Sequence, residues 1–312
     1  MVLAVDIGGT NFSLALVSDG GKFQKKLTRS TDRSGGAIWM ISNILQESRR
    51  LLKTTDATAC GISFGGPVDF ESQRIINSTH VAGWDDVELP KIVSDELSIP
   101  AVVDNDANAG ALGEHLFGAG KGSKNLVYYN IGTGIGGGII IDGVIYRGSD
   151  GNAGELGHVP ILPDGPLCDC GNRGCLEALC SGTAIGKRAQ EAVARQPRRG
   201  KVIGKIGAGE ITAKSVFDAA RKGDRLALEL VDEVCVYLGM GVATSMNAFA
   251  PDAIVIGGSV SKAGPVLLRP LREQADRFLM PVHRPHLKVI PAQLGNRSGL
   301  MGAAALAMGH EA

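Results

Sequence analysis

The chain has 312 residues, which is more than one compact core usually holds and indicates two domains. Apolar residues make up 44% and charged residues 21%, the balance of a soluble globular protein. The 32 basic and 32 acidic side chains cancel, so charge gives no reason to expect nucleic acid or an anionic membrane as a partner.

The first residues have neither the basic segment nor the long apolar core of a signal peptide. No apolar run reaches the length that spans a membrane. Cys60, Cys180 and Cys235 are scattered, whereas the other three cysteines lie within eight residues. This pattern fits reduced thiols better than a secreted disulfide framework, so we expect a cytoplasmic protein without a membrane partner.

The first third of the chain alternates strands with short polar or glycine-rich loops. Apolar patterning predicts strands at 2–6, 12–17, 23–28, 58–64 and 101–103, and helices at 37–52 and 107–117. Three of the loops are Gly8-Gly9-Thr10, Gly65-Gly66-Pro67 and Asp104-Asn105-Asp106. Each follows a predicted strand, which is where α/β proteins place their ligands.

A second passage repeats the first. Strand 126–131, the turn Gly132-Thr133-Gly134, strand 138–141, the turn Asp142-Gly143 and strand 144–146 follow in the same order and at nearly the same spacing. Such a duplication predicts two similar α/β halves. The alternative is a coincidence of common turn types.

The remainder of the chain is mostly helical. We predict strands at 253–256 and 287–290 and helices at 182–195, 213–222, 225–248, 265–278 and 298–308. Thr212 is placed to cap the second of these helices. Gly257-Gly258 closes the strand at 253–256 as a third glycine turn.

The three glycine turns together indicate a polyphosphate site, because exposed backbone N–H groups and a threonine hydroxyl can surround phosphate oxygens. Asp6 stands before the first turn, where a carboxylate can hold a hydrated Mg²⁺ on the phosphates. The alternative is that Asp6 only caps the local turn.

Asp104-Asn105-Asp106 suits a ligand that carries hydroxyl groups. An amide can donate and accept hydrogen bonds, and a carboxylate can accept a hydroxyl proton. Asp106 is our candidate general base, with Asp104 as the next choice at the same strand end. The alternative is that these residues simply cap the following helix.

The densest cluster of chemically distinctive residues contains His158, Cys168, Cys170 and Cys175. Thiolate and imidazole are preferred zinc ligands, and four of them complete a tetrahedron. Gly171 and Gly174 allow the tight turns that bring these sulfurs together. The alternative is a set of buried or disulfide-bonded cysteines.

Several of these segments together resemble the ROK family of sugar kinases, in the actin-like ATPase superfamily, over nearly the whole chain. They are Asp6-Ile-Gly-Gly-Thr10, Asp104-Asn-Asp-Ala-Asn108, Ile131-Gly-Thr-Gly-Ile-Gly-Gly137, Gly154-Glu-Leu-Gly-His158 and Cys168–Glu177. Within the family the pattern is most similar to bacterial glucokinases. The resemblance implies two actin-like (ribonuclease H-like) α/β domains with a cleft between them. We place the small domain at 1–113, with helix 298–312 packed on it, and the large domain with its zinc loop at 114–297.

The resemblance also implies roles for matching positions. Asp106 would deprotonate the attacking hydroxyl. The sugar would be bound by Asn105, Glu155, His158 and Glu177, in a pocket lined by Gly65 and His80. ATP with Mg²⁺ would be bound by Asp6, Gly8, Gly9, Thr10, Gly132, Thr133, Gly134, Gly257 and Gly258. A structural Zn²⁺ would be held by His158, Cys168, Cys170 and Cys175.

The expected reaction is ATP-dependent phosphorylation of glucose at its 6-hydroxyl. His80 stands where many relatives carry asparagine, so mannokinase, fructokinase and N-acylmannosamine kinase activities remain alternatives, and a surface position for His80 is the simpler interpretation. A sugar-responsive ROK repressor is a remote alternative, because such proteins need a DNA-reading module before the first phosphate loop and the first strand begins by Val2. We expect a homodimer or homotetramer.

Overall fold

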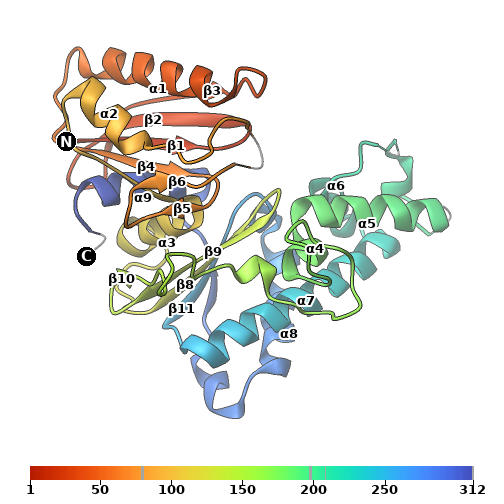
Figure 1. Ribbon diagram of the computed structural model, residues 1–312. Coiled ribbons are helices and arrows are strands. Elements are labelled where there is room, and N and C mark those ends of the chain that lie inside the picture. Colours follow the sequence, from red (N-terminus) through yellow and green to blue (C-terminus); the bar gives the residue numbers. More distant parts are fainter. Residues whose placement is uncertain (79–80, 197–198, 208, 311–312) are drawn as a thin grey trace. The chain divides into compact units, whose positions relative to one another are not determined.

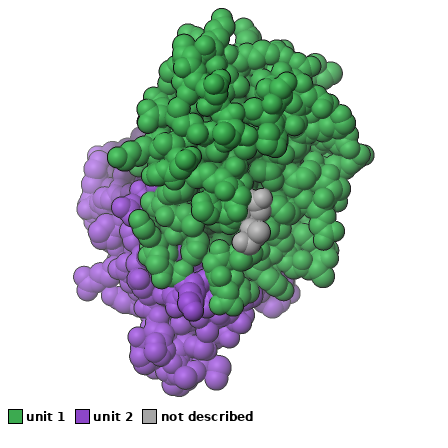
Figure 2. All heavy atoms as spheres, turned by 90° about the vertical axis from the view of Figure 1, so that its left-hand side faces the viewer, with its two compact units in different colours: residues 1–123, 138–154, 296–312 green, residues 124–137, 155–295 purple. Residues whose placement is uncertain are grey.

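The computed structural model describes residues 1–78, 81–196, 199–207 and 209–310 (Figure 1). The chain divides into two compact units, coloured separately in Figure 2. Unit 1 contains Met1–Ser123, Gly138–Gly154 and Asn296–Ala312, and unit 2 contains Lys124–Gly137 and Glu155–Gly295. Each unit therefore combines segments that are distant in the sequence.

Unit 1 is built on a five-stranded sheet in the order β3-β2-β1-β4-β7. The strands are β1 (Val2–Ile7), β2 (Asn11–Val17), β3 (Phe23–Ser30), β4 (Cys60–Phe64) and β7 (Ala101–Asn105). The strands β1, β4 and β7 run parallel, and β2 and β3 are antiparallel to their neighbours. The internal strand β4 is buried along its whole length, as expected of a strand with a parallel neighbour on each side, whereas the edge strand β3, which carries lysines, is mostly exposed.

Helices cover both faces of this sheet. They are α1 (Gly36–Leu52), α2 (Leu89–Leu97), α3 (Asp106–Phe117) and α9 (Ser298–Ala307). Figure 1 shows α1 and α2 on one face and α3 with α9 on the other. The close approach of α3 and α9 depends on glycine, because a Cβ on Gly302 would collide with the carbonyl oxygen of Ala109. A short hairpin, β5 (Val68–Asp69) and β6 (Arg74–Ile75), lies between β4 and α2 in the sequence.

The second sheet has the order β10-β9-β8-β11-β12. Its strands are β8 (Leu126–Ile131), β9 (Ile135–Ile141), β10 (Val144–Ile145), β11 (Ala253–Gly257) and β12 (Val289–Pro291). The strands β8, β11 and β12 run parallel, and β10 is antiparallel to β9. In both sheets the order is third, second, first, fourth and fifth strand along the passage, which confirms the predicted duplication.

The helices of unit 2 begin at the caps that the sequence supplies. Ser181 caps α5 (Gly182–Arg195), Thr212 forms a capping box on α6 (Ala213–Arg221), and Asp224 caps α7 (Arg225–Phe249). The other helices are α4 (Leu176–Cys180), α8 (Pro265–Phe278) and the short 3₁₀ helices η1 (Leu156–His158), η2 (Ile203–Lys205), η3 (Val260–Ala263) and η4 (Pro281–His286), with η5 (Gly295–Arg297) at the boundary.

The predicted strands and long helices are confirmed, with small shifts at their ends: the strand predicted at 58–64 begins at Cys60, and that at 138–141 begins at Ile135. The helices α2 and α4 and the β5–β6 hairpin were not predicted. The five residues of α4 and the two-residue strands of the hairpin are too short to show a clear hydrophobic period, and α2 lacks the side-chain cap that marks the start of the equally long α6. Within the residues described, no helix combines the length and the apolar character needed to cross a membrane.

Candidate active site

In unit 1, polar groups gather at the carboxyl ends of β1, β4 and β7. Asp6 Oδ1 accepts a hydrogen bond of 2.7 Å from the hydroxyl of Ser63, and a Cβ on Gly299 of α9 would lie only 2.7 Å from the same oxygen. Removal from water raises the pKa of Asp6, and the Ser63 hydrogen bond and the charge of Lys26 partly oppose that rise. A nearby cation would stabilise the ionised form of such a buried carboxylate.

The Gly8 turn, Gly65 and Asp106 adjoin one another. A Cβ on Gly65 would lie 3.2 Å from the carbonyl oxygen of Ile7, 3.8 Å from Cα of Gly8 and 3.9 Å from Oδ2 of Asp106. The backbone N–H of Gly65 donates to that Ile7 carbonyl at 2.9 Å. One edge of this sheet therefore presents a glycine turn and a carboxylate together.

Asn105 is the N-cap of α3 and Asp106 is its first residue. Asn105 Oδ1 accepts from the backbone N–H groups of Ala107 and Asn108, and its Nδ2 donates to the carbonyl of Gly66 at 2.9 Å. Asn105 therefore caps α3, and this role is compatible with ligand binding because its amide nitrogen carries a second N–H. Asp106 lies in the first turn, where the helix dipole favours negative charge.

Asp104 is a poor alternative base. Its side chain is 2% exposed, and Arg147 donates two hydrogen bonds to Oδ2, at 3.1 Å from Nε and 2.8 Å from Nη2. Oδ1 accepts from the backbone N–H of Asn105 at 2.7 Å and from Nδ2 of Asn108 at 3.0 Å. The carboxylate therefore accepts four hydrogen bonds, which is about its full capacity.

In unit 2, glycine turns follow β8 and β11. The backbone N–H of Gly182, at the start of α5, donates to the carbonyl of Gly132 at 2.7 Å. Gly258 has φ +77°, and a Cβ there would collide with the carbonyl of Ile131, so only glycine fits.

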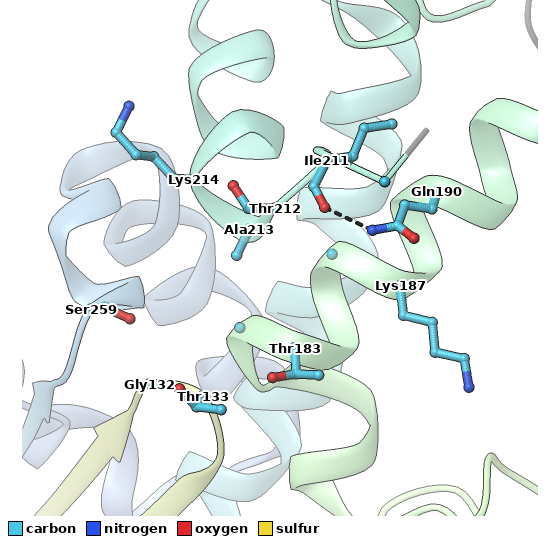
Figure 3. Close-up of a pocket in the computed structure, with 13 residues that line it drawn as sticks. Gly132, Thr133, Thr183, Lys187, Gln190, Ile211, Thr212, Ala213, Lys214 and Ser259 are labelled. Carbon is cyan, nitrogen blue, oxygen red and sulfur yellow. Dashed lines mark hydrogen bonds between the residues drawn. The ribbon is translucent and has the colours of Figure 1, made fainter. Parts of the chain in front are cut away.

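A cavity of about 480 Å³ opens beside these turns (Figure 3). Its walls come from the β8–β9 turn, from α5, from the start of α6 and from Ser259. The polar lining residues that the sequence interpretation missed are Thr183, Lys187, Gln190, Thr212 and Lys214. Gln190 Nε2 donates to the carbonyl of Ile211 at 3.0 Å and so joins two walls of the cavity. Gly134, Gly257 and Gly258 do not line the cavity itself. No local motif marks these residues, because they meet only through tertiary packing.

The predicted metal ligands converge in unit 2. One nitrogen of His158 and the sulfurs of Cys168, Cys170 and Cys175 all lie within 4.8 Å of one another. Sγ of Cys168 is 3.5 Å from Nδ1 of His158, and the sulfurs of Cys170 and Cys175 are 3.6 Å apart. Tetrahedral zinc bonds of about 2.3 Å to sulfur and about 2.0 Å to nitrogen imply separations of roughly 3.5–3.8 Å, so the residues fit the ion.

The loop that carries the cysteines is shaped by its glycines. Gly171 and Gly174 have φ +91° and +66°, and a Cβ on Gly174 would collide with the carbonyl of Leu162. Burial raises the pKa of Cys175 to about 12, whereas a backbone hydrogen bond from Asn172 lowers the pKa of Cys170 to about 7. Thiols this close together, one of them with a raised pKa, need a nearby cation for all of them to be thiolates at once.

Glu177 connects this loop with the β8–β9 turn. Its Oε2 accepts the backbone N–H of Ile135 at 2.7 Å, and its Oε1 lies 4.0 Å from Sγ of Cys168. Glu155 is 61% exposed, with Oε2 3.7 Å from Nε2 of His158. His158 thus turns Nδ1 to the sulfurs and Nε2 to Glu155. His80 lies outside the described residues.

Comparisons with known proteins agree with this architecture. The glucokinase of Thermotoga maritima is 38% identical over 307 residues, which are 98% of this chain and 96% of that protein. A crystal structure of a ROK family glucokinase from Streptomyces griseus in complex with glucose and AMPPNP matches with a TM-score of 0.87 at 35% identity, covering 99% of each chain. The xylose repressor of Caldicellulosiruptor bescii is 33% identical over 269 residues, 86% of this chain and 67% of the repressor.

The S. griseus match confirms the predicted two-domain α/β fold class. The model of the ROK family matches residues 2–310. The chain therefore belongs to the ROK family.

Proposed function

We propose that this chain is an ATP-dependent hexose kinase that phosphorylates glucose at the 6-hydroxyl. The observation that carries the proposal is the adjacency of the Gly8 turn, Gly65 and Asp106 at one sheet edge of unit 1. Phosphoryl transfer needs a phosphate site beside a group that orients the attacking hydroxyl, and it needs little covalent chemistry from the protein. Full-length similarity to glucokinases supports the same function.

Asp106 is the proposed base, which accepts the proton of the attacking hydroxyl as it reacts. Asn105 would hold a neighbouring sugar hydroxyl through its second amide N–H. Gly65 would let the sugar approach the backbone closely, and Glu155, His158 and Glu177 would bind further hydroxyls. Nε2 of His158 faces Glu155 while Nδ1 faces the sulfur of Cys168, so a ring with Nδ1 on the metal would carry its N–H on Nε2, which suits this double use.

The nucleotide is proposed to occupy the cavity of unit 2. Gly132, Thr133 and Ser259 would approach its phosphates, with Gly134, Gly257 and Gly258 shaping the two turns and Gly8, Gly9 and Thr10 of unit 1 serving the transferred phosphate. Asp6 would hold hydrated Mg²⁺. Ser63 fixes one of its carboxylate oxygens by a hydrogen bond, and the buried carboxylate has lost much of its contact with water. Mg²⁺ would supply charge neutralisation on the phosphates.

Zinc is proposed as a structural ion on His158, Cys168, Cys170 and Cys175. All four protein ligands are present, so the coordination is closed and leaves no open position for catalysis. The ion would fix the orientation of His158 and the path of the loop that leads to Glu177.

A coupled assay tests the proposed function. The purified chain is incubated with Mg²⁺ and ATP, ADP or polyphosphate, against glucose, mannose, fructose and N-acetylmannosamine. We expect the highest kcat/KM for glucose with ATP, and loss of turnover in excess EDTA. If another sugar has the highest kcat/KM, that sugar would be the substrate and the proposed mechanism would stand. If the chain binds sugars but phosphorylates none of the four, a regulatory protein would be favoured. Native mass spectrometry on the same sample tests the expected homodimer or homotetramer.

A further inference from the structure

The guanidinium group of Arg147 is hydrogen-bonded to the buried carboxylate of Asp104. Arg147 is itself 14% exposed, and both of its hydrogen bonds end on Oδ2. A buried ion pair of this kind seldom adds much stability over an apolar pair of similar size, because both charges lose water. Its presence therefore raises the question of what else it does.

The other oxygen of Asp104 binds Asn105, a proposed sugar ligand, and Asn108. Oδ1 accepts the backbone N–H of Asn105 and the side-chain amide of Asn108, one turn into α3. Asp104 thus spans the junction between β7 and α3, and Asn105 and Asp106 lie within that junction. A rotation of the Asp104 carboxylate would disturb its hydrogen bond with the backbone N–H of Asn105, next to Asp106.

The ring of Phe70 supports the guanidinium group of Arg147, which stacks on it with the guanidinium carbon 3.4 Å from the ring centroid. The turn that carries Phe70 is tied to β7 by Gln73, whose Oε1 accepts the backbone N–H of Val103 at 2.8 Å and whose Nε2 donates to the carbonyl of Phe70. The carbonyl of Arg147 accepts the N–H of Ala153 at 2.9 Å, which closes the loop that continues along the chain to Glu155.

We propose that Arg147 is a positioning residue for the sugar hydroxyl. Through two hydrogen bonds to Asp104 it fixes the orientation of Asn105 and Asp106 without touching the sugar. This inference rests on the proposed kinase function. A misplacement of about 1 Å in a reacting group can cost about 10²-fold in rate, so the effect should fall on turnover of the sugar.

The test compares Arg147→Met, Arg147→Lys and Arg147→Gly with wild type. We expect kcat/KM for the sugar to fall about 10²-fold in Arg147→Met, with calorimetric AMPPNP binding unchanged. Lysine keeps the charge but not the fork of two donors, so Arg147→Lys should recover only part of the loss. Millimolar guanidinium should restore turnover to Arg147→Gly, since the cation can occupy the space between Asp104 and Phe70.

Arg29→Met is the matched control. Arg29 donates two hydrogen bonds to one oxygen of Glu47 in the same way, at 3.0 and 2.8 Å, but it lies on the edge strand β3. Arg147→Met activity within threefold of the Arg29→Met control would overturn the inference, as would a loss of turnover accompanied by an equal loss of AMPPNP binding and no guanidinium rescue. A wild-type chain that phosphorylates no sugar would instead defeat the proposed function.

Discussion

Two carboxylates separated by a single residue have different surroundings. Asp104 is buried and accepts four hydrogen bonds, whereas Asp106 opens α3 next to Gly65 and the Gly8 turn. Burial raises the pKa of Asp104, and the Arg147 charge and the hydrogen bonds from Asn108, Arg147 and Asn105 oppose that rise. The first carboxylate is therefore engaged in holding the second in position, and the chemistry is expected at Asp106.

Asp106→Asn should abolish most turnover and leave glucose affinity largely intact. Asparagine keeps the shape and can hydrogen-bond a hydroxyl, but it cannot accept the proton. A positioned base contributes about 10²–10⁴-fold in rate, so kcat with ATP should fall by that factor while the calorimetric Kd for glucose changes little. Asp95→Asn, an exposed aspartate that pairs with Lys91 on α2, is the control. A fall in kcat of less than about tenfold would remove Asp106 from the role of base.

At the scale of elements, the loop that carries Cys168, Cys170 and Cys175 continues directly into α4. Cys175 is the N-cap residue of α4 and Glu177 lies in its first turn, where it holds the N–H of Ile135. A change at the metal should therefore reach the β8–β9 turn through one short helix.

Cys175→Ser should lose the ion and weaken glucose binding, because the ion would fix His158 and the loop that leads to Glu177. Changes around a bound metal commonly cost about 10–100-fold in metal affinity or activity, so a fall in activity of at least this size is expected. Native mass spectrometry counts the ion, with one zinc expected per wild-type chain and none in the variant. Cys235→Ser is the control, because Cys235 is a buried cysteine of α7 whose thiol lies 3.6 Å from the carbonyl oxygen of Leu267 and which is not one of the four clustered ligands. A metal-free preparation with full activity would contradict a structural role for zinc.

The contact between α3 and α9 makes a separate prediction about stability. A Cβ on Gly302 would collide with the carbonyl of Ala109, so Gly302→Ala must push the helices apart at a cost of about 1–3 kcal/mol or more. Gly20→Ala is the control, since no atom lies within 4 Å of its added Cβ. Urea denaturation measures both free energies of unfolding, and equal midpoints for the two variants would show that the helices tolerate the methyl group.

For the whole molecule, the duplicated sheets suggest a division of labour between units 1 and 2. Hydrogen exchange with AMPPNP alone should protect the amides of residues 182–190 and 211–214, which line the cavity of unit 2. Glucose alone should protect residues 105–108 of unit 1 and residues 155–158. Protection of 105–108 by AMPPNP without sugar would contradict this assignment of ligands.

The sequence allowed the duplication, the glycine turns and the metal cluster to be predicted, because each depends on residues close together in the chain. Asp104 and Asp106 could be placed at a strand end, with Asp106 preferred as the base. The hydrogen bonds that occupy Asp104 could not be predicted, since its partner Arg147 lies more than forty residues later. Likewise, the cavity of unit 2 brings together Lys187, Gln190 and Lys214 only when α5 packs against α6. No short sequence motif predicts this.

The placement of α9 has a consequence for biosynthesis. This helix packs against α3 and across β1, β4 and β7, and Gly299 at its start lies against Asp6. During translation, however, residues 298–307 emerge after all of unit 2. A ribosome that has reached residue 295 has made every residue of unit 2, while unit 1 still lacks a buried helix and exposes the apolar surface that α9 will cover. Unit 1 begins to be synthesised first but is thus completed after unit 2, and a translational pause between residues 295 and 307 would leave that apolar surface open to chaperones.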